Sequence, residues 1–131
     1  MSNSDDVVLD SSAVLGYLQQ EKGTESTLFL LERAVMSSVN LAEVRTKLID
    51  LGDQALASGE VVLKLIRRIE PFTKEDAIAA SSLRKTTSHA GLSLGDRACL
   101  ALGITLGVEV YTADKAWSRL GDIGCQIHML R

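Results

Sequence analysis

The sequence has little proline, cysteine or aromatic content, and each shortage excludes a class of structure. Its 131 residues include one Pro, two Cys, one Trp, two Tyr and two Phe. Cys99 and Cys125 lie in apolar surroundings without a CxxC spacing, so we expect reduced core thiols rather than a disulfide framework or a zinc site. With 46% hydrophobic and 24% charged residues, the composition is that of an ordered domain rather than a disordered segment.

Long apolar runs and an excess of basic charge are also missing. No apolar run approaches the roughly 18 residues of a membrane span. Residues 1–6 lack the basic and apolar regions of a signal peptide, which favours a cytoplasmic location. The net charge of −3 argues against nonspecific coating of nucleic acid, because that binding requires Lys and Arg to neutralise phosphates. It does not exclude a nuclease, whose metal site needs several carboxylates.

Short apolar runs alternate with helical patterns, which is typical of a parallel sheet built from βαβ units. We expect strands at residues 7–9, 35–39, 68–72, 107–111 and 126–130, with the proline-containing third strand at an edge. Helices are expected after Asp10 and at residues 24–33, 40–51, 55–67, 73–83 and 93–106, and a polar loop at 84–91. The length suits one domain, residues 1–131. The predicted fold class is therefore α/β, with three α/β/α layers and a mainly parallel central sheet.

Two of the expected strands end in an aspartate. Asp10 follows the first strand directly, and Asp114 lies just beyond the strand that ends at Tyr111. In an open parallel sheet the ligand crevice lies outside the carboxyl ends of the strands. These two acids are therefore candidates for one acidic pocket.

Three expected helix starts have the spacing of a capping box, in which a side chain and an acid three residues later satisfy free backbone donors. The pairs are Asn40 with Glu43, Thr73 with Asp76, and Ser93 with Asp96. Capping contributes about 1 kcal/mol and by itself accounts for all three acids; Glu43 is also spaced for a surface ion pair with Lys47. Asp76 follows an edge strand, so we interpret it only as a cap. Glu43 and Asp96 open helices beside central strands and remain site candidates.

Four segments resemble the signature blocks of the PIN-domain ribonucleases, and in particular the VapC toxin of VapBC toxin–antitoxin pairs. They are Val8-Leu9-Asp10-Ser11-Ser12-Ala13, Ser37-Ser38-Val39-Asn40-Leu41-Ala42-Glu43-Val44, Leu92-Ser93-Leu94-Gly95-Asp96-Arg97-Ala98-Cys99-Leu100-Ala101-Leu102 and Thr112-Ala113-Asp114-Lys115-Ala116-Trp117. The blocks occur in family order and together cover nearly the whole chain.

The resemblance implies a set of roles for these positions. The catalytic and metal-binding residues would be Asp10, Glu43, Asp96 and Asp114, supported by Ser12, Asn40 and Thr112. Gly95 and Trp117 also match, and we interpret Trp117 as a packing anchor rather than a base-stacking platform. His89 and His128 have no partner at ligand spacing, so we expect structural or solvated roles for them.

The chemistry that carboxylates support agrees with these roles. Oxygen ligands suit Mg²⁺ or Mn²⁺, and such a metal lowers the pKa of a water that attacks a phosphodiester bond. The resulting prediction is a divalent-metal-dependent endoribonuclease acting on RNA through metal-activated water, with transfer, ribosomal and messenger RNA all compatible. Two alternatives stay open: a noncatalytic metal-binding interaction module, and a phosphoacceptor signalling domain, which lacks support because no acceptor aspartate follows the second strand.

The resemblance also implies protein partners, because toxins of this kind are held inactive by a small antitoxin and commonly form homodimers. The segment Leu28-Phe29-Leu30-Leu31 places apolar residues all round a short helix, more than one core face requires. We therefore expect part of this segment to be covered by a partner. No membrane partner is expected.

Overall fold

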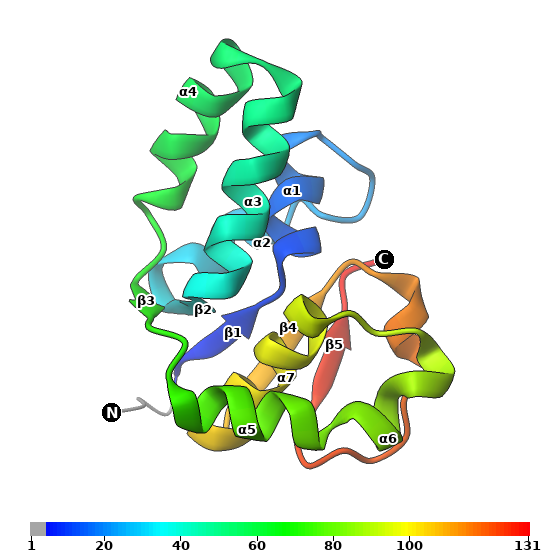
Figure 1. Cartoon of the computed structure of the whole chain (residues 1–131). Helices are drawn as coiled ribbons and strands as arrows, with labels where there is room; N and C mark the ends of the chain where they lie inside the picture. The colour runs from blue at the N-terminus through cyan, green and yellow to red at the C-terminus, as the bar shows by residue number, and fades with distance from the viewer. Residues whose placement is uncertain (1–4) are drawn as a thin grey trace.

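Five short parallel strands form the central sheet, in the order β3-β2-β1-β4-β5 (Figure 1). The structure is a computed structural model that describes residues 5–131; residues 1–4, which begin the expected domain and the segment without signal-peptide features, lie outside the described residues. The strands are β1 (Val7–Leu9), β2 (Ala34–Ser37), β3 (Arg68–Glu70), β4 (Glu109–Thr112) and β5 (Ile127–Met129). The expected parallel sheet and the edge position of β3 are confirmed.

Helices cover both faces of this sheet. In chain order they are α1 (Ser11–Leu18), α2 (Thr27–Leu30), α3 (Ser38–Leu51), α4 (Asp53–Leu63), α5 (Lys74–Ser82), α6 (Arg84–Thr87) and α7 (Leu94–Leu106). Short 3-10 turns add η1 (Leu31–Arg33), η2 (Ser88–Ala90) and η3 (Lys115–Arg119). Figure 1 shows α1 to α4 on one side of the sheet and α5 and α7 on the other, which is the expected three-layer arrangement.

Alternation along the strands divides the core in two. Val7 and Leu9 of β1 pack with residues of α1, α3 and α4 in one cluster, whereas Val8 packs with α7 in the other. All three side chains are fully buried. A strand covered by helices on both faces reads as a continuous apolar run, which is why β1 has the sequence Val-Val-Leu.

The boundary error that bears on the site concerns the start of α3. The sequence pattern predicted a strand to residue 39 and a helix capped by Asn40, but β2 ends at Ser37 and α3 begins at Ser38. The Ser37 hydroxyl accepts a hydrogen bond from the Val39 amide at 3.2 Å, so Ser37 is the cap. Asn40 lies inside the helix, where its side chain is free to make a tertiary contact. The predicted Asn40–Glu43 capping box is therefore wrong.

Other boundaries also differ from the expected ones. Residues 24–33 form α2 and η1 rather than one helix, and the expected loop at 84–91 contains α6 and η2. The predicted helix at 55–67 is α4, Asp53–Leu63. The capping boxes of Thr73 with Asp76 and of Ser93 with Asp96 are confirmed.

Both cysteines are free, as expected. Within residues 5–131, no helix has the length and apolar character needed to cross a bilayer.

Close packing of α7 on β4 gives a test of this core. A Cβ atom at Gly103 would overlap the side chain of Val110, which is fully buried. Alanine normally stabilises a helix relative to glycine by up to about 1 kcal/mol, but overpacking a core costs about 1–3 kcal/mol. We expect Gly103→Ala to lower the unfolding free energy by about 1 kcal/mol or more, measured by urea denaturation. Gly121→Ala, with nothing within 4 Å of its Cβ position, is the control, and equal stability of the two variants would refute the packing argument.

Candidate functional site

Asp10 lies at the carboxyl end of β1, the central strand of the sheet. Its amide donates to the carbonyl of Tyr111 on β4 at 3.0 Å, and the residue is only 1% exposed. Its carboxylate Oδ2 accepts hydrogen bonds from Ser12 Oγ at 2.6 Å and Thr112 Oγ1 at 2.9 Å. Its Oδ1 is buried and has no protein partner. One oxygen of this carboxylate is thus fixed, and the other is left with free lone pairs.

Asp114 is held to the same hydroxyl groups through the backbone. Its amide donates to Thr112 Oγ1 at 3.0 Å, and the neighbouring Ala113 amide donates to Ser12 Oγ at 3.0 Å. The Asp114 carboxylate caps η3 by accepting from the Ala116 amide at 3.0 Å. Ser12 and Thr112 therefore align the ends of β1 and β4, which brings Asp10 and Asp114 to one edge of the sheet.

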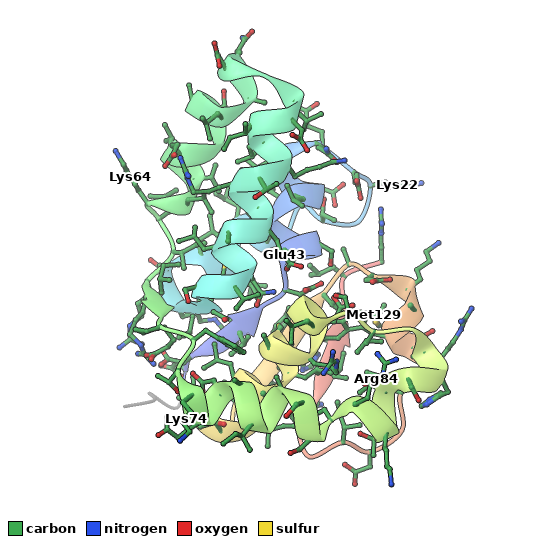
Figure 2. The ribbon with its side chains drawn as sticks, viewed as in Figure 1. Lys22, Glu43, Lys64, Lys74, Arg84 and Met129 are labelled. Carbon is green, nitrogen blue, oxygen red and sulfur yellow. The ribbon has the colours of Figure 1, made fainter. Side chains whose placement is uncertain are left out.

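Glu43 reaches this edge from α3. Its Oε1 accepts from Ser11 Oγ of α1 at 3.0 Å and from Asn40 Nδ2 at 2.9 Å. The fully buried Asn40 side chain also donates to the carbonyl of Gly95 on α7 at 3.0 Å. A Cβ atom at Gly95 would overlap the Glu43 carboxylate. Glycine at position 95 therefore allows α7 to approach α3, and Figure 2 shows Glu43 well inside the outline of the molecule, between α3 and α7.

Asp96 lies in the first turn of α7, where it caps the helix and also faces the other acids. Its Oδ2 accepts from the Ser93 amide at 2.9 Å, and its own amide donates to Ser93 Oγ at 3.2 Å. This is the capping box that the sequence predicted. The side chain is also close enough to the other acids to interact with them electrostatically. Asp96 therefore both caps α7 and belongs to the acidic pocket.

Burial and mutual repulsion raise the pKa of two of these acids. Burial raises the pKa of Asp10 from its usual 3.8 to about 6, and repulsion from Asp96 adds to this, against hydrogen bonds from Ser12 and Thr112 that lower it. Burial likewise raises the pKa of Asp96, reinforced by repulsion from Asp114 and Glu43 and opposed by the Ser93 hydrogen bonds. These are the effects expected when carboxylates share a partly dehydrated pocket.

The structure thus gathers Asp10, Glu43, Asp96 and Asp114 from four separate segments. Ser12, Asn40 and Thr112 each contact one of these acids directly. Asp76 makes only its capping contacts with Thr73. Among residues 5–131, no three acidic, His or Cys side chains are already arranged as a metal-ligand group. The acids are therefore neighbours in one pocket rather than a formed coordination shell.

Three residues contribute to this pocket through contacts that the sequence did not predict. Ser11 bonds Glu43 across 32 positions, Gly95 makes room for Glu43, and Arg131 Nε donates to the Ala113 carbonyl at 3.0 Å. No local pattern marks the first or the last of them. Gly95 had a signal, since it directly precedes Asp96 in the third block, but its contact with α3 depends on tertiary packing.

Neither histidine belongs to the acidic pocket. His89 Nε2 lies 3.0 Å from the carbonyl of Arg119, and His128 stacks on Tyr111 and lies 2.8 Å from Glu109 Oε1. Trp117 is 1% exposed and packs in the core cluster beneath η3, so its interpretation as a packing anchor is confirmed.

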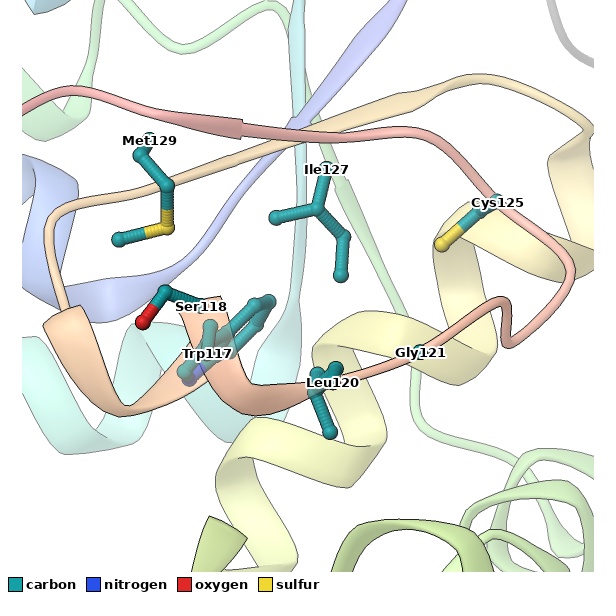
Figure 3. Close-up of a pocket in the computed structure, with 7 residues that line it drawn as sticks. All are labelled: Trp117, Ser118, Leu120, Gly121, Cys125, Ile127 and Met129. Atoms are coloured by element: carbon teal, nitrogen blue, oxygen red, sulfur yellow. The ribbon is translucent and has the colours of Figure 1, made fainter.

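A separate cavity of about 260 Å³ lies beside Trp117, lined also by Ser118, Leu120, Gly121, Cys125, Ile127 and Met129 (Figure 3). Burial, with a smaller contribution from Asp122, raises the pKa of the Cys125 thiol to about 11. The thiol is therefore protonated near neutral pH and is a poor nucleophile. This cavity offers packing space but no acid–base group.

The sequence profile of the PIN domain matches residues 7–123, most of the chain. The chain therefore belongs to the PIN domain family. A comparison with curated protein sequences gives no significant match.

Several solved structures with the same fold are of toxins or toxin–antitoxin complexes. A toxin–antitoxin complex from Klebsiella pneumoniae is 16% identical, with a TM-score of 0.75 over 96% of this chain and 98% of that chain. A sarcin-ricin-loop-cleaving VapC toxin from Mycobacterium tuberculosis is 17% identical, with a TM-score of 0.73 over 92% and 99% of the two chains. DNA-bound VapBC from Salmonella typhimurium is 17% identical, with a TM-score of 0.70 over 96% and 98%. At such identities the likeness establishes the shared fold.

The raised pKa of Asp10 predicts a pH dependence of stability. A group whose pKa is raised by folding stabilises the fold below its unfolded pKa, near 3.8, and this contribution is lost as the pH rises through about 6. A shift of this size corresponds to roughly 3 kcal/mol. We expect Asp10→Asn to be more stable than wild type at pH 7 in chelator, with this advantage shrinking toward pH 4.

Urea denaturation of both proteins across this pH range measures the difference. Asp76→Asn, which removes a carboxylate outside the pocket, is the matched control. Parallel stability–pH curves for wild type and Asp10→Asn would show that Asp10 is not held in a charge-disfavouring site.

Proposed function

We propose that this chain is a divalent-metal-dependent endoribonuclease and the toxin of a type II toxin–antitoxin pair. The observation that carries the proposal is the convergence of Asp10, Glu43, Asp96 and Asp114 at the carboxyl edge of the sheet in a PIN-domain chain. Structural relatives from toxin–antitoxin systems, one of them a toxin that cleaves the sarcin-ricin loop, support the choice of RNA as substrate. The predicted site residues and their roles are retained as part of this proposal.

The pocket fits a hard divalent cation in its donor chemistry. Asp10 Oδ1 is buried without a protein partner, which is costly unless another group satisfies it. Mg²⁺ takes one or two carboxylates directly and keeps several waters, so it does not require a preformed cage of three acids. Asp10 and the acids nearest to it would therefore hold Mg²⁺ or Mn²⁺ directly. The remaining acids would hold the waters that the ion keeps. When bound, the metal supplies Lewis-acid stabilisation of the charge that develops on the phosphate and acidifies water.

The protein residues then have distinct tasks. Ser12 and Thr112 fix the orientation of the Asp10 carboxylate, since both donate to the same oxygen. Asn40 and Ser11 orient Glu43 by donating to one of its oxygens and leaving the other free of those bonds. A carboxylate oriented in this way can accept a proton from an attacking water. Asp114 and Asp96 complete the negative field that favours cation binding.

Two alternatives from the sequence are weaker. A phosphoacceptor domain requires an acidic acceptor after a middle strand, whereas β2 is followed by Ser38, Val39 and Asn40. A noncatalytic metal-binding module would also use the acids, and only activity distinguishes it from a nuclease. A cytoplasmic location is part of the proposal, since RNA substrates and reduced cysteines agree with it.

The proposed partner surface lies at α2. Phe29 is 77% exposed, Leu28 45% and Leu65 53%. With Leu31 and Glu32 they line a surface pocket of about 320 Å³. Clustered exposed apolar side chains mark interaction sites, and the relatives crystallised with antitoxins support an antitoxin as the occupant. We propose homodimerisation as well, as the resemblance to VapC implies.

Amide substitutions test the catalytic assignment. We expect Asp10→Asn, Glu43→Gln, Asp96→Asn and Asp114→Asn each to lower RNA cleavage by about 10²-fold or more, with folded structure retained by circular dichroism. Chelator should abolish wild-type cleavage, and added Mg²⁺ or Mn²⁺ should restore it. Asp76→Asn is the control because it caps α5 outside the pocket. Equal loss in the control, or full activity in chelator, would rule out the assignment.

Toxicity and neutralisation test the partner surface. We expect expression of the wild type alone to arrest growth and Asp96→Asn to be harmless. Phe29→Asp should stay toxic, because the residue is exposed, but should resist neutralisation by a cognate antitoxin. Ile78→Asp, at an apolar residue of α5 that is 57% exposed, is the control. Normal neutralisation of Phe29→Asp would show that the antitoxin binds elsewhere.

A further inference from the structure

Four segments that are distant in the sequence are linked by an ion pair and hydrogen bonds beside the acidic pocket. We call residues 19–26, 84–90, 115–119 and 130–131 the basic flank. Arg131 joins the first segment to the site, because its Nη1 pairs with Glu21 at 2.6 Å and its Nε donates to the Ala113 carbonyl. Ala113 precedes Asp114, which caps η3. At the other end of η3, the Arg119 carbonyl lies 3.0 Å from His89 of η2, which directly follows α6.

The flank has a charge opposite to that of the rest of the chain. It contains six of the 14 Lys and Arg residues but only two of the 17 Asp and Glu residues, a formal charge of +4. The remaining residues hold eight basic and 15 acidic side chains, a charge of −7, which gives the chain total of −3. The six cations are Lys22, Arg84, Lys85, Lys115, Arg119 and Arg131.

Five of these six cations are available for a ligand, whereas Arg131 is paired with Glu21. All six residues are exposed. Among the ion pairs of residues 5–131, only that of Arg131 with Glu21 involves the flank. Elsewhere in the described chain, Arg45, Arg67 and Arg68 are occupied by acidic partners. Figure 2 shows Lys22 and Arg84 in the right half of the view and Lys64 and Lys74 in the left half.

In a nuclease with an acidic pocket, positive charge on this flank would offset the repulsion between the pocket and the substrate. The pocket carboxylates repel the phosphates of the substrate, so the affinity for a polyanion must come from positive charge outside the pocket. The basic flank begins one residue from Asp114 and extends away from it in two directions, through Arg131 to Lys22 and through η3 to α6.

We propose that the basic flank binds the sugar–phosphate backbone of single-stranded RNA on either side of the cleaved bond. This inference rests on the proposed nuclease function and specifies which surface of the domain its substrate follows. The opposite edge, with Lys64 and Lys74, takes no part. An acidic peptide from a partner protein is the competing occupant of the flank and is included in the test.

Matched double substitutions distinguish RNA binding by the basic flank from RNA binding by the opposite edge. Both double variants carry Asp96→Asn, which prevents cleavage. The flank variant has Lys22→Gln and Lys85→Gln, and the control variant has Lys64→Gln and Lys74→Gln. Both pairs remove two exposed lysine charges. Fluorescence anisotropy measures binding of a mixed-sequence single-stranded RNA and, separately, of poly-glutamate, over a salt titration. Thermal melts confirm that both variants are folded.

We expect the flank variant to bind RNA on the order of tenfold more weakly and to lower the slope of log K against log salt by about 1.4, since each phosphate contact contributes about 0.7. The Lys64 and Lys74 variant should match its parent. With Asp96 restored, the flank variant should show a raised KM and an unchanged kcat, because the contacts are equal in ground and transition states.

Three outcomes distinguish this inference from the proposed function. Wild-type cleavage with equal RNA binding by both double variants overturns the flank and leaves the nuclease standing. Loss of poly-glutamate binding alone in the flank variant also overturns it, in favour of a peptide surface. Absence of wild-type cleavage, with RNA binding still lost only in the flank variant, supports the flank and overturns the nuclease.

Discussion

Burial of the Asp10 carboxylate at the end of the central strand is the constraint on which the rest of the pocket depends. A buried carboxylate is costly unless hydrogen bonds or a cation compensate for lost hydration. Two hydroxyl donors, from Ser12 and Thr112, meet one of its oxygens. The same hydroxyl groups accept amide bonds from Ala113 and Asp114. The hydroxyl groups that stabilise the Asp10 carboxylate thereby also set the position of Asp114.

The helices impose a second constraint, which is the close approach of α3 to α7. Asn40 joins them by donating both to Glu43 and to the Gly95 carbonyl. Because a side chain at position 95 would overlap the Glu43 carboxylate, the approach requires glycine there. The two sides of the pocket are thus connected through buried polar contacts, which are strong when every member is satisfied. Two oxygens of this network, Asp10 Oδ1 and Asn40 Oδ1, are buried without a partner, and of the two the carboxylate oxygen of Asp10 is the one suited to cation binding.

Charge separation across the surface follows from the same arrangement. An acidic pocket concentrates negative potential that attracts a cation and repels a nucleic acid. The net charge of −3 conceals this division, because the basic residues near η3, α6 and the carboxyl terminus are balanced by acids elsewhere. The overall charge argues against nonspecific coating of nucleic acid, whereas the local positive charge favours contact with nucleic acid at that surface.

The sequence by itself determined the parallel α/β class, the edge position of β3, the two confirmed capping boxes and the positions of the acids. These features follow from local periods and from short spacings: alternation of apolar runs, an acid at the end of a strand, and a hydroxyl three residues before an aspartate. Tertiary structure decided which contacts those residues make. Ser37 rather than Asn40 caps α3, and the Asn40 side chain instead contacts the carbonyl of Gly95, 55 positions away. Ser11 and Arg131 also join the site through tertiary contacts, since their partners are brought near only when the sheet is assembled. Raised pKa values at Asp10 and Asp96 likewise depend on burial and on acids from other elements, and burial is a property of the packed fold that no local spacing encodes.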